Sequence, residues 1–222
     1  MSVDLTVIVD NARTEGGLLS EHGLSVGIRL GQRSFIFDTS ATPQALRANA
    51  ELLSLDLASV EAVIISHGHP GHTGGLTALL AARPGLKVHA SPAAFAHRWS
   101  DRPDRPMREI SWHSGPDALA SHGAVFCPVT DPGMLADGLL VSGPIGGRQG
   151  HADRYVIQQG DSLAADVFRD ELFLMVRGAA GWAVLVGCCH RGLRNTLRLA
   201  SFLAHGEPIQ MVLGGLHLSG AG

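Results

Sequence analysis

The alternation of apolar and polar positions in the first part of the chain predicts short β-strands joined by turns. Residues 5–9 are β-branched and apolar, residues 24–30 alternate, and residues 34–39 resume the pattern after a Gly-Gln-Arg turn. Period-two patterns bounded by turn residues are typical of strands. We therefore expect the second and third of these segments to form a hairpin.

The pattern then changes to a succession of helices and strands. Residues 42–55 place apolar side chains at helical spacing behind a Thr-Pro start, and residues 60–66 are a continuous apolar run. A second helical pattern over 73–85 stops at Pro84-Gly85, and a strand pattern follows at 86–91. Strands and helices in this order predict a layered α/β domain.

The second half of the chain has less regular stretches. Residues 92–122 are rich in Pro, Arg and Asp and are expected to form a surface excursion with a short helix near 115–121. Residues 138–171 are expected to form a polar connector containing several glycines. The pattern then predicts strands at 172–178 and 181–187, an amphipathic helix at 192–206 and a last strand at 209–215.

Composition narrows the class of protein. The 222 residues are expected to form one domain (1–222), with 45% hydrophobic residues, 17% charged residues and a net charge of −3. The chain has no basic stripe typical of nucleic-acid binding and no apolar run of membrane-spanning length. With three cysteines and no signal-peptide pattern, we expect reduced thiols and a cytoplasmic location.

The sequence SHGHPGHTGGL, residues 66–76, concentrates three histidines directly after a predicted strand. Their spacing does not place His67, His69 and His72 on one face of a helix or strand, but an irregular loop lets them converge. Three imidazole nitrogens with one open position are typical of a catalytic zinc site. The alternative is a histidine-rich turn that binds nothing.

This loop resembles the H-x-H-x-D-H signature of the metallo-β-lactamase-fold hydrolases. Other segments are similar to the branch of that superfamily that includes an archaeal enzyme joining a dihydropterin to a ribofuranosyl-aminobenzene phosphate. They are, in chain order, 9–30 with its Glu-His-Gly-Leu-Ser run, FIFDTS at 35–40, SGPIGGR at 142–148, VLVGCCHRGLRNTL at 184–197 and VLGGLHL at 212–218. The resemblance implies a four-layer αβ/βα sandwich of the metallo-β-lactamase type.

The resemblance also implies a role for each matching residue. The implied metal ligands are His67, His69, His72, Cys188, His190 and His217. Asp38 would orient the loop or a ligand histidine, and His22 would carry protons or contact substrate. Arg148, in the glycine-rich 142–150 stretch, would hold a phosphate; the alternative for that stretch is a plain surface loop. Cys188 would otherwise be a small buried hydrophobic residue, and His190 a residue that only begins a helix.

Gly71 occupies the position of the signature aspartate, which ligates a second metal in the family pattern. Three interpretations remain: one metal held by His67, His69 and a third ligand such as His190; two metals, with water or Cys188 replacing the carboxylate; or loss of catalysis. Losing a carboxylate favours nitrogen-preferring zinc over harder metals.

The leading functional hypothesis is a zinc-dependent hydrolase, with one or two ions, that acts on an ester, lactone, amide or phosphoester of a small molecule. The alternatives are a pterin-related transferase (synthase) and a degenerate, non-catalytic protein that binds a metal or another ligand. The branch usually continues beyond the GGxHL segment, so the resemblance also describes the sandwich as C-terminally shortened. A second copy of the chain is a candidate to cover the apolar surface exposed in this way, as a homodimer.

Overall fold

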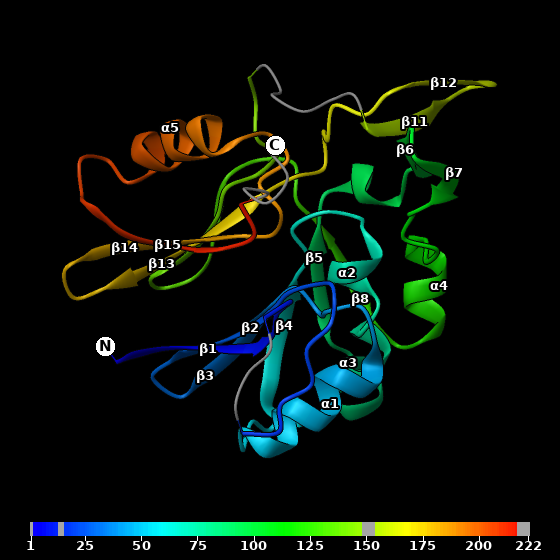
Figure 1. Cartoon of the computed structure of the whole chain (residues 1–222). Helices are drawn as coiled ribbons and strands as arrows, with labels where there is room; N and C mark the ends of the chain where they lie inside the picture. Colours follow the sequence, from blue (N-terminus) through cyan, green and yellow to red (C-terminus); the bar gives the residue numbers. More distant parts are fainter. Residues whose placement is uncertain (1, 13–15, 148–153, 217–222) are drawn as a thin grey trace.

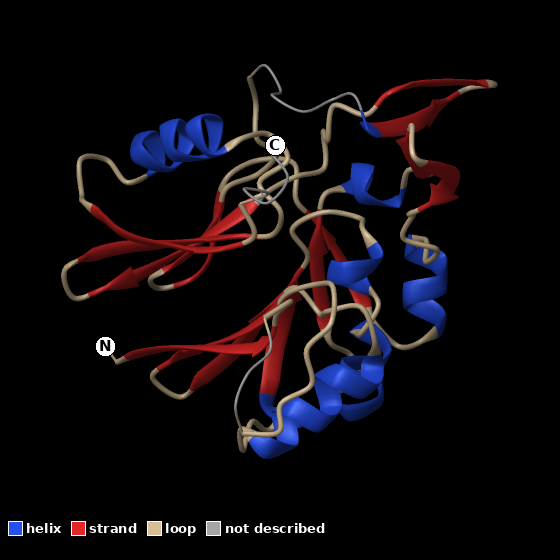
Figure 2. Cartoon of the chain, in the orientation of Figure 1, coloured by secondary structure: helices blue, strands red, loops and turns tan. Residues whose placement is uncertain are grey.

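Two β-sheets face each other in the middle of the molecule, and helices cover the outer face of each sheet (Figures 1 and 2). The computed structural model describes residues 2–12, 16–147 and 154–216. This is the four-layer αβ/βα arrangement that the sequence predicted. Among the described residues, no helix has the length and apolar character needed to cross a bilayer.

The first sheet has six strands in the order β1-β2-β3-β4-β5-β8. Its strands are β1 (Val3–Val9), β2 (Ser25–Leu30), β3 (Arg33–Phe37), β4 (Val60–Ile64), β5 (Lys87–Ala90) and β8 (Val125–Pro128). β1, β2 and β3 pair antiparallel, so the expected hairpin is present, whereas β3, β4, β5 and β8 run parallel. The carboxyl ends of β3 and β4 therefore lie side by side, and the segments that follow them begin at the same edge.

The second sheet has five strands in the order β15-β14-β13-β10-β9. They are β9 (Gly133–Ala136), β10 (Leu139–Val141), β13 (Phe173–Gly178), β14 (Gly181–Val186) and β15 (Ile209–Gly214). β13 and β14 form an antiparallel hairpin, and β14 pairs parallel with β15. The chain leaves the carboxyl end of β14 through the Gly-Cys-Cys-His segment.

Helices connect many of the strands along the chain. They are α1 (Pro43–Leu52), α2 (Pro70–Thr73), α3 (Leu76–Ala82), α4 (Pro116–Ser121) and α5 (Leu193–Leu203), with 3₁₀ turns at Leu57–Ser59 and Pro92–Phe95. At the start of α1 the Thr42 side chain accepts a hydrogen bond from the Ala45 N–H, and Pro43 fills the first turn. α1 and α3 lie on the first sheet and α5 lies on the second (Figure 1).

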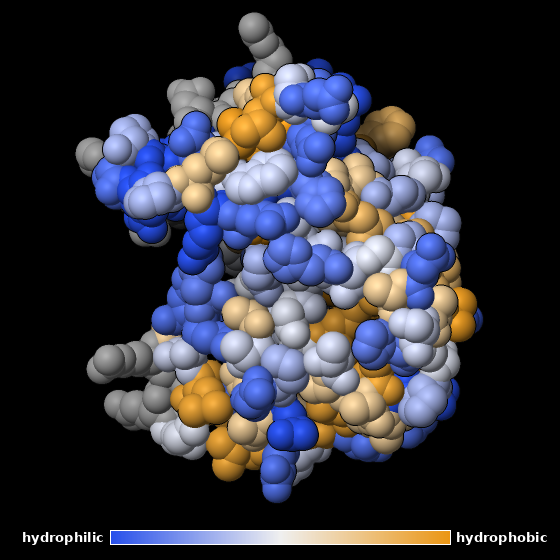
Figure 3. All heavy atoms as spheres, turned by 90° about the vertical axis from the view of Figure 1, so that its right-hand side faces the viewer, coloured by the Kyte–Doolittle hydropathy of each residue, from blue (hydrophilic) through white to orange (hydrophobic). Residues whose placement is uncertain are grey.

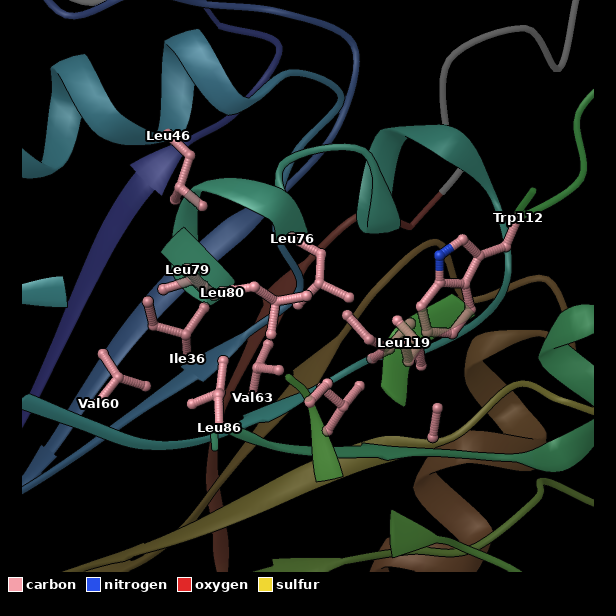
Figure 4. Close-up of a cluster of buried hydrophobic side chains, with 14 of the residues drawn as sticks. Ile36, Leu46, Val60, Val63, Leu76, Leu79, Leu80, Leu86, Trp112 and Leu119 are labelled. Atoms are coloured by element: carbon pink, nitrogen blue, oxygen red, sulfur yellow. The ribbon is translucent and has the colours of Figure 1, made fainter. Parts of the chain in front are cut away.

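Three buried clusters hold these layers together. Ile36, Leu46 and Leu79 belong to the cluster between the first sheet and its helices (Figure 4). Phe37, Ile64 and residues of β13 and β14 fill the space between the two sheets. A third cluster packs the outer face of the second sheet against α5. Each central strand is thus apolar on both faces, as expected for a sheet covered on both sides.

A small third sheet corrects two expectations from the sequence. Its order is β12-β11-β6-β7, with strands β6 (Arg98–Arg102), β7 (Arg105–Glu109), β11 (Tyr155–Gln159) and β12 (Ser162–Ala165). The surface excursion at 92–122 therefore contains a hairpin besides the expected α4, and the connector at 138–171 contains β10, β11 and β12. β6 pairs with β11, more than fifty residues later, so no local apolar pattern announced this sheet.

Candidate metal centre

Two loops that leave neighbouring strand ends bring a group of histidines together. The chain leaves β4 through Ser66, and His67 and His69 follow; His190 comes from the segment after β14 in the other sheet. One nitrogen of each of these three histidines lies within 4.8 Å of the other two. Three imidazoles at this spacing, all of them buried, are a donor set that suits a divalent metal such as zinc.

Hydrogen bonding fixes which nitrogen His67 offers. The Ser66 hydroxyl donates to Asp38 Oδ2 at 2.7 Å and lies 2.9 Å from His67 Nδ1. A carboxylate can only accept, so the single hydroxyl proton is committed to Asp38 and the hydroxyl oxygen must accept from His67 Nδ1–H. His67 Nε2 therefore carries the lone pair. Nε2 of His67 and of His69 is buried and has no hydrogen-bond partner among the described residues, as expected of atoms that bind a metal.

His72 and Cys188 form a second group beside the first. His72 Nδ1 lies 2.6 Å from Asp38 Oδ2, and His72 Nε2 lies 3.1 Å from Cys188 Sγ. These two residues and His67 also have donor atoms within 4.8 Å of one another. Asp38, completely buried, thus orients His72 directly and His67 through Ser66.

Burial and charge set the protonation of these imidazoles. Burial, reinforced by the charge of His72, lowers the pKa of His67 to about 4. Burial likewise lowers the pKa of His69 well below its usual value. For His72, burial also acts to lower the pKa, but the charges of Cys188 and Asp38 outweigh it and hold the pKa well above its usual value. His67 and His69 are therefore neutral and able to bind a metal, whereas His72 lies between the Asp38 carboxylate and the Cys188 sulfur.

The two groups of potential ligands share His67, which limits how many metal ions they can bind together. Ser66 engages one nitrogen of His67, so only Nε2 is left, and a single imidazole lone pair binds one ion. An ion among His67, His69 and His190 and an ion among His67, His72 and Cys188 would compete for that nitrogen. Among the described residues, the geometry thus fits one ion held by His67 more readily than two.

Backbone crosses the space where a side chain at position 71 would lie. A Cβ on Gly71 would meet the carbonyl oxygen of His22 at 2.8 Å, and a Cβ on Gly23 would meet the Gly71 oxygen at 2.2 Å. The Leu24 N–H donates to that same oxygen at 3.1 Å. The Glu21 carboxylate holds the crossing segment in place by accepting from the Thr42 N–H and hydroxyl, both at 2.8 Å. Any side chain at position 71, including the signature aspartate, would therefore require this backbone crossing to shift.

Buried carboxylates hold the ligand loops from behind. The Glu171 carboxylate accepts from the His190 N–H at 2.6 Å and from the Arg191 N–H at 2.5 Å. Asp170 accepts from the Gly68 N–H at 2.8 Å and from the Arg98 guanidinium at 2.9 Å. Arg98 is fully buried, and its Nε lies 3.5 Å from Asp166 as well. These residues position the loops without lying among the ligand donors.

A pocket of about 460 Å³ opens onto the ligand groups. It is lined on one side by His69, His72, Cys188 and His190 and on the other by residues of β6, β7 and β11. His22 lines it too, with its Nδ1 3.3 Å from the Asn11 side-chain nitrogen. The described residues that line a larger cleft of about 800 Å³, beside β1 and β2, include neither histidine nor cysteine.

Aromatic rings support the ligand imidazoles inside this pocket. The Phe168 ring stacks on His190 with centroids 4.0 Å apart, and the Tyr155 ring lies 5.6 Å from that of His69 and 5.3 Å from that of His190. Such packing restricts the ring orientations of the ligands.

The structure brings together most of the site residues that the sequence singled out. His67, His69, His72, Cys188 and His190 converge, Asp38 lies beneath them, and His22 lines the pocket. The two remaining candidates, Arg148 and His217, lie outside the described residues. The functions assigned to all of these residues stay predictions.

Sequence reasoning missed the supporting residues. Ser66 precedes the first histidine directly, and Asp170-Glu171 stand just before an apolar strand, so both had a local signal. Arg98, Tyr155 and Phe168 had none, because they reach the site only through the third sheet and the segment after it.

Comparisons with known proteins agree with this fold. The family model described as the metallo-β-lactamase superfamily matches residues 22–164. Over 225 residues the chain is 23% identical to the 7,8-dihydropterin-6-methyl-4-(β-D-ribofuranosyl)-aminobenzene-5'-phosphate synthase of Methanocaldococcus jannaschii, covering 96% of this chain and 76% of that protein.

Solved structures show the same fold. A metal-dependent hydrolase of the β-lactamase superfamily superposes with a TM-score of 0.80 and 27% identity, over 98% of this chain and 78% of that one. A quorum-quenching N-acyl homoserine lactone lactonase superposes with a TM-score of 0.53 and 12% identity, over 96% of this chain and 88% of that one. The match to the family model, which spans more than half of the chain, shows that the protein belongs to the metallo-β-lactamase superfamily.

Proposed function

We propose that the protein is a zinc-dependent hydrolase that cleaves an ester, lactone, amide or phosphoester bond in a small molecule. The observation that carries this proposal is the convergence of His67, His69 and His190, the last two of which line a pocket of about 460 Å³. Pockets of this size hold small molecules. Nitrogen and sulfur donors without a carboxylate among them favour zinc over magnesium or calcium.

The chain's own residues would prepare the site. Bound zinc would lower the pKa of a water to about 7 and polarise a carbonyl or phosphoryl oxygen. Ser66 fixes His67 in the tautomer that ligates through Nε2, and Asp38 fixes the orientation of His72. His22, at the wall of the same pocket, is placed to contact a substrate or accept a proton.

A transferase is the second candidate, and one comparison favours it. The relative from Methanocaldococcus jannaschii is named a synthase, and it aligns with nearly the whole chain at 23% identity. The same metal site would then serve the joining of two substrates rather than hydrolysis. A non-catalytic metal-binding protein is the third candidate, favoured by the glycine at position 71.

Metal content and turnover test the proposal. Protein purified without chelators should contain about one zinc per chain, measured by inductively coupled plasma mass spectrometry. The His69→Ala variant should lose the zinc, whereas His113→Ala, a histidine outside the site with a largely exposed side chain, should keep it. Alkylation of Cys188 gives an independent readout, since zinc should slow its reaction with iodoacetamide.

Chromogenic esters, lactones and phosphodiesters should then be hydrolysed by the zinc-loaded protein and not by His69→Ala. Zinc binding without turnover of any of these would favour the transferase or the non-catalytic candidate. A well-folded protein that binds no divalent metal would overturn the proposal.

A further inference from the structure

The wall of the pocket opposite the ligands carries positive charge. Ser100, Arg102, Arg108 and Tyr155 of the third sheet all line the pocket that also contains His69 and His190. Residues of β6 and β7 line the pocket together with Pro70 and His72 of α2, and β11 and β12 lie above β6 and β7 (Figure 1). A substrate bound at the metal centre would therefore contact this hairpin.

Strand register explains how two arginines come to share one wall. Ser100 of β6 pairs with Arg108 of β7, and Arg102 pairs with Arg105 at the end of the hairpin. On the other side, Ser100 pairs with Tyr155 of β11, whose ring packs near His69 and His190. The aromatic contact thus fixes the third sheet over the ligand loops. Arg102 and Arg108 are diagonal rather than directly opposite neighbours, and both line the same pocket.

The two guanidinium groups on this wall have no acidic partner among the described residues. Neither Arg102 nor Arg108 forms an ion pair with any residue in the described part of the chain, and Arg102 Nε is buried with no hydrogen-bond partner there. Elsewhere Arg33 pairs with Glu61, and buried Arg98 pairs with Asp170. A buried donor without a partner is costly and calls for an acceptor.

Glu109, the one carboxylate among the described residues that line the pocket, does not supply that acceptor. Glu109 accepts from the Ser111 hydroxyl at 2.9 Å and lies 3.2 Å from His97 Nδ1, with His113 at 4.0 Å. These contacts engage the Glu109 carboxylate, which forms no ion pair with Arg102 or Arg108 in the described part of the chain. Hydrophilic side chains are frequent on the side of the molecule that carries this hairpin (Figure 3).

We propose that Arg102 and Arg108 bind a negatively charged group of the substrate, a phosphate or a carboxylate, and so select anionic substrates. The inference rests on the proposed function, since it identifies the class of molecule that the same site cleaves. A guanidinium group can donate two parallel hydrogen bonds to a phosphate or to a carboxylate. What the two candidate groups share is an oxyanion, which would bind on the pocket wall opposite the metal ligands.

Anion binding to designed variants tests this assignment. Inorganic phosphate and acetate would be titrated into the zinc-loaded protein and into chelator-treated protein by calorimetry. The variants are Arg102→Gln, Arg108→Gln, the double variant, and Arg105→Gln as the control from the same hairpin, whose neighbour is Asp104 at the turn. Arg102→Lys keeps the charge and should restore part of the binding.

We expect the double variant to bind the preferred anion at least about tenfold more weakly, with Arg105→Gln unchanged. Tighter binding of phosphate would identify the substrate group as a phosphate, and tighter binding of acetate would identify it as a carboxylate. Equal binding by wild type and double variant, no binding of either anion, or binding that chelation abolishes in the wild type would overturn the assignment. The double variant should bind as much zinc as wild type. Because Arg108 is exposed, Arg108→Gln should fold normally, so that a loss of anion binding in this variant is not due to misfolding.

The two proposals fail in different ways. If the protein holds no zinc but loses anion binding in the double variant, the hydrolase proposal fails and the anion site stands. If the protein binds zinc and hydrolyses esters, and the double variant binds anions as tightly as wild type, the hydrolase proposal stands and this inference fails.

Discussion

Replacing Gly71 by alanine tests the backbone crossing at the candidate metal centre. Gly71 lies in the short helix α2, and a glycine-to-alanine change in a helix normally stabilises a protein by about 1 kcal/mol. Here the added Cβ would lie 2.8 Å from the His22 carbonyl oxygen, a backbone atom that cannot rotate away. Overpacking of this kind costs about 1–3 kcal/mol. The sign of the effect is therefore the test.

We expect Gly71→Ala to lower the free energy of unfolding by up to about 2 kcal/mol once the helix preference is subtracted. In a chain of this length that lowers Tm by up to about 8 °C. Differential scanning calorimetry would measure it, with Gly133→Ala as the control. Gly133 lies in β9, and a Cβ added there meets no atom within 4 Å, so that variant should be unchanged or slightly more stable.

The Gly71→Asp variant extends the same test to metal binding. An aspartate would bring the signature carboxylate into space that the backbone of His22 and Gly23 occupies. We expect it to be destabilised at least as much as Gly71→Ala, with zinc per chain no higher than in wild type. The reasoning would be refuted by a Gly71→Asp protein as stable as wild type that binds a second zinc.

Three further perturbations address the residues around the ligands. Asp38→Asn should weaken zinc binding by about 10- to 100-fold in competition with a chelator, because the amide holds Ser66, and through it the ligand His67, less well. Arg98→Met should cost about 3–5 kcal/mol in urea unfolding, since it leaves buried Asp170 unpaired, whereas Arg33→Met at an exposed pair should cost at most about 1 kcal/mol. Metal-free protein should lose stability as pH falls from about 6.5 to about 4: folded His67 stays neutral there while the unfolded chain takes up a proton, so protonation favours unfolding. The dependence should flatten in His67→Phe; an unchanged pH profile would exclude His67 as the cause.

The sequence was informative where local pattern and structure coincide. The alternation over 24–39 and the apolar runs at 60–66 and 181–187 gave the central strands of both sheets, because these strands are buried whatever their partners are. The ligand candidates stand at the ends of those same strands. A polar cluster at the end of a buried strand is a local signal, and therefore His67 and His190 were found.

The sequence was uninformative where a residue depends on a distant partner. β7 is exposed along its whole length, and β6 has polar or charged residues at four of its five positions, so neither has an apolar period. β6 pairs with β11, which follows β8 of the first sheet and β9 and β10 of the second along the chain. The same holds for Arg98, whose burial among acidic residues follows from tertiary contacts alone. A charged residue in a Pro- and Arg-rich stretch reads as solvent-exposed until its carboxylate partners are known.

The supporting carboxylates also show how the centre is divided between the two halves of the chain. Asp38, from the first half, holds Ser66 and His72, which lie in that half. Asp170, from the second half, reaches across to the Gly68 N–H of the histidine loop, and Glu171 next to it holds the backbone of His190. One adjacent acidic pair thus fixes ligand loops from both sheets. These carboxylates accept hydrogen bonds from backbone and side-chain groups and do not lie among the ligand donors. The fold therefore positions the ligand loops, and a metal would enter a site that is already arranged.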